Sequence, residues 1–283
     1  MYKHEKDQKK QTQSDDSVSC TSGTTISTDI VSRINPDKGS KCVSAVNDNE
    51  AWCGCDGDLV LIDIHDNLKR KIQLNNIQIV FDIAVTTKGE IFVTELDGTN
   101  IKKYLQDDRC INIADTKAYE TQGICLTSVQ DDILVCLYIH NNSKVVRMTT
   151  AGQMKQTIQK DKQQQLLYKN PLYVAENINE DVVVVNVKGE YRYKYPDSSQ
   201  STYRIKRCCG IACDNTGCIL VSDCGNHRIH QIDMDGRFIQ FIFTQQHEVQ
   251  CPLGLSIDNK GQLWLCNNVG NKIQYYTIEQ PYV

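Results

Sequence analysis

The sequence predicts an all-β chain built from repeated four-stranded antiparallel sheets. Residues 208–243 hold four short apolar runs, separated by Gly, Asn and Asp residues that supply the positive-φ positions of tight hairpin turns. The same pattern recurs along the chain. The first residue of each second strand falls at Ala51, Ile91, Ile133, Val182, Ile219 and Leu263, at intervals of 40, 42, 49, 37 and 44 residues. Because propeller blades repeat every 40 to 50 residues or so, six copies predict a six-bladed β-propeller.

A second repeated feature keeps the same position relative to these strands. The segments Glu95–Ile101, Asp223–Ile229 and Asn267–Ile273 each run from the end of a second strand into a third strand, over the same six-residue step. The polar residue that begins each segment is interpreted as structural, because a side-chain acceptor there can bind N–H groups of a turn. The Asn226 or Asn271 that follows tolerates the left-handed conformation.

The ends of the array predict how the ring closes. Residues 28–34 (TDIVSRI) read as one strand ahead of the first blade, and Asn35 and Pro36 end it. The last blade, by contrast, has three strands, expected at residues 253–258, 263–267 and 272–278. We therefore expect residues 30–34 to supply the fourth strand of the last blade, which removes two exposed sheet edges.

The other blades follow in order. The first three are expected at residues 42–74, 81–113 and 123–159, the third with an enlarged turn at residues 138–143. The fourth is abbreviated: residues 181–187 form a single run where two strands and a turn are expected. Either this blade has three strands or neighbouring loops fill the gap.

The N-terminal residues and the composition bound the protein class. Residues 1–23 are almost devoid of apolar side chains, so we expect a disordered tail ahead of a propeller domain at residues 24–283. The net charge of −4 gives no global argument for binding nucleic acid, and we expect no DNA partner. No apolar run is long enough to span a bilayer and no signal core is present, so we expect a cytoplasmic protein without a membrane partner.

The sequence offers little catalytic or metal chemistry. The 14 cysteines contain no C-x2-C pair, and the cluster Cys213, Cys218, Cys224 and His227 is broken up by strand phase. We expect free thiols, no metal and no cofactor. Signatures of hydrolase, nucleotide and zinc-protease sites are absent from the sequence. Some six-bladed propellers are metal-dependent lyases or hydrolases with ligands at the central channel, but the histidines here do not share a channel-facing phase. We therefore expect a protein that is not an enzyme, and keep the propeller lyase or hydrolase as an alternative.

Two short segments carry a family resemblance. Residues 225–229 (GNHRI) and 270–273 (GNKI) resemble the NHL-repeat signature. Together with residues 82–86 (DIAVT), 145–147 (VVR) and 210–212 (GIA), they resemble the C-terminal NHL propeller of tripartite-motif (TRIM) proteins of the diverged invertebrate type. The resemblance covers residues 30–276. It implies a recognition module for a protein or for single-stranded RNA. Ligase activity in that family belongs to an N-terminal RING finger, which this sequence does not show, so a role in the ubiquitin pathway would be recognition alone.

A partner is expected on one rim of the propeller, where second-to-third-strand turns and the connections between blades come together. Residues 203–207 (YRIKR) form the densest basic and aromatic run, and Arg and Tyr are common at interface hot spots. The acidic residues Glu95, Asp97 and Asp223 on this rim favour a protein over RNA, although these turns can equally be ordinary solvated loops. The candidate partner-binding residues are Tyr203, Arg204, Lys206, Arg207, His227, Arg228, Lys144, Lys169 and His247.

Overall fold

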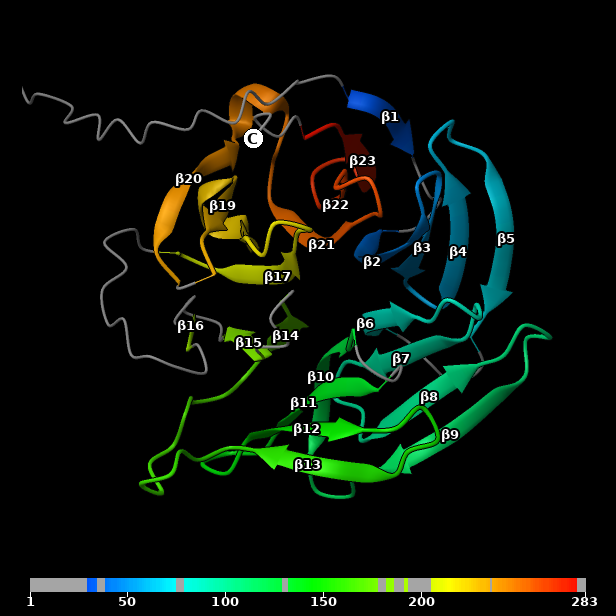
Figure 1. The fold of residues 1–283 in the computed structure, drawn as a ribbon. Coiled ribbons are helices and arrows are strands. Elements are labelled where there is room, and N and C mark those ends of the chain that lie inside the picture. The colour runs from blue at the N-terminus through cyan, green and yellow to red at the C-terminus, as the bar shows by residue number, and fades with distance from the viewer. Residues whose placement is uncertain are drawn as a thin grey trace, which may run out of the picture.

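The computed structural model describes residues 30–34, 39–74, 79–128, 132–177, 182–185, 191–192, 205–234 and 236–278. In these ranges the chain forms strands β1 to β23 and two single turns of 3₁₀ helix, η1 and η2, with no α-helix. Figure 1 shows small antiparallel sheets arranged around a common centre. The predicted all-β propeller architecture is confirmed. No helix in the described ranges has the length and apolarity needed to cross a bilayer.

Five of the sheets have four strands and one has three. The first sheet consists of β2 (Ser40–Asn47), β3 (Glu50–Cys55), β4 (Asp58–Asp63) and β5 (Leu68–Gln73). The second consists of β6 (Val80–Val85), β7 (Ile91–Glu95), β8 (Asn100–Tyr104) and β9 (Cys110–Asp115). The third consists of β10 (Glu120–Leu126), β11 (Ile133–Tyr138), β12 (Lys144–Met148) and β13 (Met154–Ile158).

The remaining sheets complete the order of the chain. The three-stranded sheet consists of β14 (Tyr173–Glu176), β15 (Val182–Val185) and β16 (Tyr191–Arg192). The fifth sheet consists of β17 (Cys208–Cys213), β18 (Ile219–Asp223), β19 (Arg228–Ile232) and β20 (Phe238–Phe243), with η1 (Cys224–Asn226) between β18 and β19. After η2 (Gln245–His247), the last sheet consists of β21 (Pro252–Ile257), β22 (Leu263–Asn267), β23 (Lys272–Tyr276) and β1 (Ile30–Ile34).

The second strands begin where the repeat predicts them. β7, β11, β15, β18 and β22 start at the predicted residue, and β3 starts at Glu50, one residue early. Hairpin turns fix this register. Gly217 and Gly261, in the turns before β18 and β22, adopt φ values of 86° and 78°, which glycine reaches without the steric cost that a Cβ would impose. The local turn chemistry therefore sets the phase of the array.

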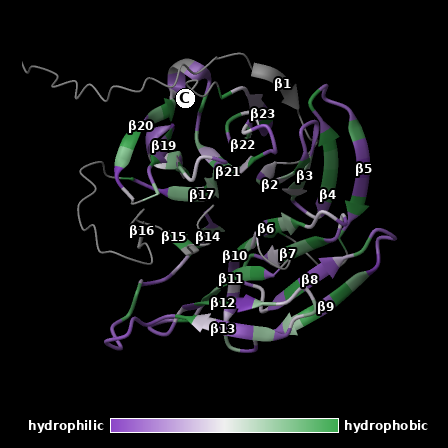
Figure 2. Ribbon diagram, viewed as in Figure 1, coloured by the Kyte–Doolittle hydropathy of each residue, from purple (hydrophilic) through white to green (hydrophobic). Residues whose placement is uncertain are grey.

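The core of the molecule is divided among the interfaces between neighbouring sheets. The six sheets share six hydrophobic clusters, one at each junction, including the junction between the last sheet and the first. The first strands β2, β6, β10, β14, β17 and β21 contact one another in this order and back to β2, so they form the inner ring. Hydrophobic residues concentrate on the inner strands, and hydrophilic residues on the turns and on parts of the outer strands such as β5 and β13 (Figure 2). Each sheet thus buries both faces only because it has a neighbour on each side.

Close packing at the centre depends on small residues in the first strands. A Cβ built on Gly254 would lie 2.6 Å from the Cα of Cys42 in the next sheet, and one on Gly210 would lie 2.7 Å from the carbonyl oxygen of Leu253. Gly123 is in the same situation against Leu172. The first strands can approach so closely because these positions have no side chain.

The ring is closed by β1, as predicted. β1 pairs antiparallel with β23, with Ile30 opposite Tyr276 and Ile34 opposite Ile273. In Figure 1, β1 lies beside β23 at the outer edge of the last sheet. The last sheet is therefore completed by residues from the opposite end of the chain.

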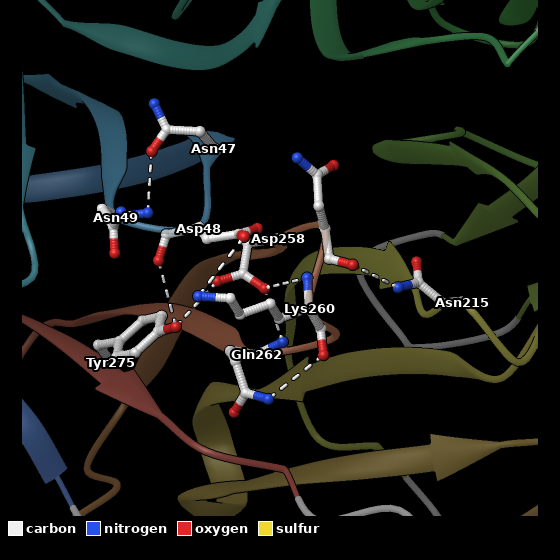
Figure 3. A network of polar contacts seen from close by, with 9 residues as sticks. Asn47, Asp48, Asn49, Asn215, Asp258, Lys260, Gln262 and Tyr275 are labelled. Atoms are coloured by element: carbon white, nitrogen blue, oxygen red, sulfur yellow. Dashed lines mark hydrogen bonds and ion pairs between the residues drawn. The ribbon is translucent and has the colours of Figure 1, made fainter.

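A polar network at one face of this closure joins the last sheet to its neighbours (Figure 3). The Tyr275 hydroxyl donates to Asp258 Oδ2 at 3.0 Å, and the Lys260 ammonium lies 3.5 Å from Asp48 Oδ2 in the β2–β3 turn. On the other side, Asn215 Nδ2 donates to the carbonyl oxygen of Asn259 at 3.1 Å. These contacts connect the first, last and fifth sheets on the face opposite the predicted partner rim.

The abbreviated fourth sheet agrees with one of the two predicted outcomes. Among the described residues it has three strands, and β15, at Val182–Val185, lies within the single apolar run. Its first strand, β14, packs against the third and fifth sheets through Val174 and Tyr173. The inner strand of this sheet is in place, so the inner ring is continuous through the fourth sheet.

Candidate partner-binding rim

Four segments between the fifth and last sheets form one surface, which we call the rim: residues 205–207, 224–228, 247–251 and 268–272. Backbone hydrogen bonds join them in sequence. The Cys224 N–H donates to the carbonyl of Arg207 at 2.9 Å, and the Asn268 N–H donates to the carbonyl of Cys251 at 3.2 Å. The Cys251 N–H in turn donates to His227 Nδ1 at 2.9 Å. The rim is thus a continuous structure, although its parts are far apart in sequence.

Asp223, at the end of β18, holds the first part of the rim. Its carboxylate is fully buried, and Oδ1 accepts from the N–H groups of Lys206 and Arg207 at 3.0 and 3.3 Å. Its other oxygen accepts from Asn226 Nδ2 at 2.6 Å and from His230 Nε2 at 3.1 Å. Burial alone would raise the pKa of Asp223, but these hydrogen bonds outweigh it and leave the pKa below its usual range. The carboxylate is therefore charged and saturated with donors.

The same arrangement recurs at Asn267, the end of the second strand of the last sheet, but not at Glu95. Asn267 accepts from the Gln250 N–H at 3.0 Å, and its Nδ2 donates to the carbonyl of Glu248 and to Gln274 Oε1. Glu95 pairs instead with the Lys102 ammonium at 2.5 Å. The predicted structural role of these acceptors is confirmed for Asp223 and Asn267. The backbone donors, however, come from the connection entering the sheet and not from the turn that follows the strand.

Lys206 and Arg207 are the exposed cations of the rim, and their backbone is fixed from below. The aliphatic part of Lys206 lies over Gly225, where an added Cβ would come within 2.8 Å of Lys206 Cγ. Neither side chain forms an ion pair with any residue that the structure describes. Because the backbone is anchored while the charged ends face solvent, these two residues form a preorganised cationic dyad.

The other predicted binding residues of the rim have structural partners. His227 adopts a left-handed φ of 56° and accepts the Cys251 hydrogen bond. The Arg228 guanidinium lies 3.9 Å from the centre of the Phe241 ring and 3.5 Å from Asp223 Oδ2. His247 Nδ1 accepts from the Thr244 N–H at 3.0 Å, within a capping box that begins η2. All three are half-buried, so they shape the rim more than they present charge on it.

Two details of the sequence interpretation change here. The left-handed residue of the β18–β19 turn is His227, not Asn226, because η1 continues through Asn226 and moves the reversal one residue on. Asn271 does adopt the left-handed conformation, with a φ of 49°.

The acidic side chains used to favour a protein partner are also less available than expected: Asp223 is buried and Glu95 is half-buried against Lys102, which leaves Asp97 exposed.

The remaining predicted residues lie elsewhere. Lys144 begins β12, and its ammonium lies 4.4 Å from the centre of the Tyr119 ring. Lys169 follows in the exposed connection to β14. Both are separated from the rim by the three-stranded sheet. Tyr203 and Arg204 lie outside the described residues.

Apolar exposure on this face was not predicted from the sequence. Val269, in the β22–β23 turn of the rim, is 49% exposed, and Leu96, in the equivalent β7–β8 turn, is 44% exposed. A hydrophobic residue at the tip of a tight turn has no partner within its own sheet, and this could have been read from the sequence. Exposed aliphatic side chains near a cationic dyad are a common composition for a protein interface.

Asp82, on the inner strand β6, is the second group that sequence reasoning missed. It occupies the position where β10, β17 and β21 have glycine, and this break in the pattern is the signal that could have found it. Its carboxylate accepts from the N–H groups of Ile83 and Ile124, both at 3.0 Å. Burial nevertheless raises the pKa of Asp82 to about 7. Asp82 therefore bridges the second and third sheets with a carboxyl group that titrates near neutral pH.

Two members of the cysteine and histidine cluster considered in the sequence, Cys224 and His227, both contact Cys251. Cys224 contacts Cys251 of the last sheet, with the two sulfurs 3.1 Å apart. Within the described ranges, no group of three or more His, Cys, Asp or Glu side chains is arranged to hold a metal ion. The described histidines 65, 140, 227, 230 and 247 all lie outside the first strands of the sheets.

Comparison with known proteins supports the fold alone. No protein-family model matches the sequence, and no curated protein matches it. Among solved structures, virginiamycin B lyase from Staphylococcus aureus is similar with a TM-score of 0.60 and 12% identity, over 87% of this chain and 98% of the lyase. A chain of the nidogen–laminin complex is similar with a TM-score of 0.60 and 12% identity, over 78% of this chain and 85% of that one.

A third similar structure is the PQQ-bound aldose sugar dehydrogenase from Streptomyces coelicolor. Its TM-score is 0.69 at 9% identity, over 91% of this chain and 100% of the dehydrogenase. These neighbours include enzymes and a protein of a binding complex, so similarity at this level identifies a β-propeller and does not select a function. The resemblance to TRIM-NHL propellers is not among these matches, and the comparisons support the propeller fold without that identity.

Proposed function

We propose that this chain is a six-bladed NHL-type propeller, with the three-stranded sheet as its abbreviated fourth blade, and that it acts as a non-catalytic recognition module. The rim binds an acidic segment of a partner protein. The six interfacial clusters support the blade count, since each sheet has a neighbour on both sides. The free thiols among the described cysteines suit the reducing cytoplasm.

The observation that carries the proposal is the anchored dyad Lys206–Arg207. Its backbone is held by a buried carboxylate, so binding does not require ordering of the loop, which lowers the entropic cost of association. The Arg207 guanidinium can form a bidentate pair with a partner carboxylate, and the Lys206 ammonium adds a second positive charge beside it. The exposed Val269 on the same rim offers an apolar contact.

The character of the exposed hydrophobic residues favours a protein over single-stranded RNA. RNA-binding surfaces stack bases on exposed aromatic rings. Among the described residues no exposed large hydrophobic side chain is aromatic; Leu96 and Val269, in the β7–β8 and β22–β23 turns, are two of the exposed apolar residues on this face. Exposed Glu248 interrupts the positive charge of the rim, which a polyanion would not favour. RNA therefore stands as the second candidate partner.

A lyase or hydrolase function receives less support from the residues themselves. The described histidines are in turns or in third strands, and His230 is buried against Asp223, Phe238 and Phe241. Asp82 is the carboxyl group of the inner ring with a neutral-range pKa, but both of its oxygens accept backbone hydrogen bonds between two sheets. These contacts indicate that Asp82 holds the inner strands β6 and β10 together.

The test is a peptide selection with a charge-matched control. A displayed library of random peptides is selected on the wild-type chain, and binders are then measured against the variant Lys206→Ala/Arg207→Ala. The control, Lys88→Ala/Arg237→Ala, removes the same two charges from exposed turns on the opposite face.

Acidic peptides should be enriched on the wild-type chain, should bind at least about tenfold more weakly to the rim variant, and should bind the control variant normally. All three proteins should have the same melting temperature. If the peptides bind the rim variant as well as the wild type, the dyad is not the binding site. If single-stranded oligonucleotides bind in their place, with affinity that falls steeply with salt, the RNA function holds.

A further inference from the structure

Three cysteines from separate parts of the chain meet on the rim. Cys209 is the second residue of β17 in the fifth sheet, Cys224 begins η1, and Cys251 precedes β21 of the last sheet. The sulfurs of Cys224 and Cys251 lie 3.1 Å apart, and the Cys224 thiol also hydrogen-bonds with Cys209. We propose that Cys224 and Cys251 form a reversible disulfide that connects the fifth and last sheets on the rim.

The geometry needs little change to make this bond. A disulfide has an S–S distance of about 2.05 Å, so the two sulfurs must approach by roughly 1 Å. Both backbones are already fixed: the Cys224 N–H donates to Arg207, and the Cys251 N–H donates to His227 Nδ1. Cys251 also adopts a φ of 54°, an uncommon conformation for a residue with a side chain. The structure therefore holds the two thiols in contact.

Access separates Cys251 from the cysteines packed around the first sheet. Cys251 is half-buried and contacts the buried Cys224. Cys42 is buried in the cluster between the first and second sheets, and Cys53, Cys55 and Cys266 are buried in the cluster between the first and last sheets. Burial raises the pKa of Cys42 and Cys53 well above the usual range. Burial and the contact with Cys224 also raise the pKa of Cys251, so Cys251 is distinguished by its accessibility and by its contact with Cys224, not by its acidity. An oxidant in solution can reach Cys251 first, with Cys224 in position to resolve the product.

The chemistry is a two-electron oxidation by a hydroperoxide. The sulfur of Cys251 attacks the O–O bond of hydrogen peroxide, which gives a sulfenic acid and releases one water. The sulfur of Cys224 then attacks the sulfenic sulfur, the S–S bond forms, and the hydroxyl group leaves with the Cys224 proton as a second water. A dithiol reverses the reaction by thiol–disulfide exchange. Two thiols are oxidised and one peroxide is reduced.

Cys209 has a defined place beside this pair. Its hydrogen bond with Cys224 lowers its pKa, an effect that burial opposes and that nearby Arg207 assists. As the more acidic thiol it competes with Cys251 for Cys224. The proposal assigns the bond to Cys251, because Cys251 is the accessible member and its sulfur contacts Cys224 directly.

The experiment is peptide mapping of the full chain under non-reducing conditions, after treatment with hydrogen peroxide and, separately, with glutathione disulfide. The expected product is a peptide pair joined through Cys224 and Cys251 that dithiothreitol releases. Cys224→Ser and Cys251→Ser should each abolish it, whereas Cys110→Ser, which removes an exposed thiol on β9, should leave it intact. Oxidation should also raise the melting temperature of the wild type by about 5–10 °C, because the bond closes a loop of nearly thirty residues, and should not raise that of Cys251→Ser.

Other products would overturn the assignment. A Cys209–Cys224 cross-link would show that the buried thiol is the partner. Modification of Cys110 without any link at Cys224 would show that the oxidant acted and that the pair does not react. Neither result depends on whether the rim binds a peptide, so this inference and the proposed recognition function can fail separately.

Discussion

Deleting residues 1–36 removes β1 and should destabilise the whole ring. In the structure β1 pairs with β23 at four positions, from Ile30 opposite Tyr276 to Ile34 opposite Ile273. A ladder of this size has about four backbone hydrogen bonds, each worth a net 0.5–1.5 kcal/mol or so, which gives about 2–6 kcal/mol. Against a typical total stability of about 5–15 kcal/mol, this loss is large.

The loss should be visible as a fall in melting temperature of about 5–20 °C, since about 1 kcal/mol corresponds to 2–4 °C in a chain of this size. Thermal unfolding followed by circular dichroism measures it. Deletion of residues 1–23 is the matched control, because it removes most of the preceding chain and leaves β1 in place. The truncated chain should also associate, because β23 then presents an unpaired edge.

Adding a synthetic peptide of residues 28–36 to the longer truncation should recover part of the lost stability. This second measurement separates a missing strand from a general folding defect. If both truncations melt together with the full chain, then the β1–β23 pairing contributes nothing to stability and the reasoning is wrong.

Two further predictions concern the inner ring. Gly254→Ala should cost about 1–3 kcal/mol, because the new Cβ would lie 2.6 Å from the backbone of Cys42; in Gly39→Ala the new Cβ would meet the side-chain oxygen of Asn271 at 3.1 Å, and urea unfolding should show that variant to be nearly normal. Burial raises the pKa of Asp82 to about 7, above an unfolded value near 4. Its contribution to stability is therefore fully present below about pH 4 and is lost as the pH rises to 7, by up to about 4 kcal/mol. Asp82→Asn should flatten this pH dependence in urea unfolding between pH 4 and 8, and an unchanged slope would refute the assignment.

The sequence was most informative where structure is set locally. Hairpin turns such as the one containing Gly217 impose their conformation through a few adjacent residues, so the phase of the second strands could be predicted to within one residue. The closing strand was also predictable, because a strand without a partner and a sheet lacking a strand stood at opposite ends of the chain. Both deductions use hydrogen-bonding needs that each segment carries by itself.

Contacts between sheets were not accessible in this way. Cys224 and Cys251 are 27 positions apart in the sequence and are brought together by the ring geometry, and nothing in the local sequence pattern pairs them. Asp82 joins two sheets because its carboxylate accepts a hydrogen bond from the N–H of Ile124 in the next sheet. The exposure of Lys206 and the burial of Asp223 likewise depend on how the connection that enters the fifth sheet lies over the β18–β19 turn. Local periodicity contains no information on these distances.

The position of the cationic dyad has an electrostatic reason. Lys206 and Arg207 are adjacent like charges, and Arg228 lies close to the same carboxylate, so without a counter-charge their repulsion would disfavour the observed loop. Asp223 supplies a buried negative charge directly beneath them, and the low pKa of Asp223 keeps this charge present at neutral pH.

At the equivalent site of the last sheet, Asn267 is neutral, and the connection it holds contains Glu248 and Gln250 and no cationic pair. At these two sites the residue at the end of the second strand matches the charge of the connection above it. The carboxylate of Asp223 stabilises a basic connection, while the amide of Asn267, which both donates and accepts, holds an acidic one. Under the proposed function, Asp223 would therefore place the acidic partner beside the fifth sheet, although its direct role is structural.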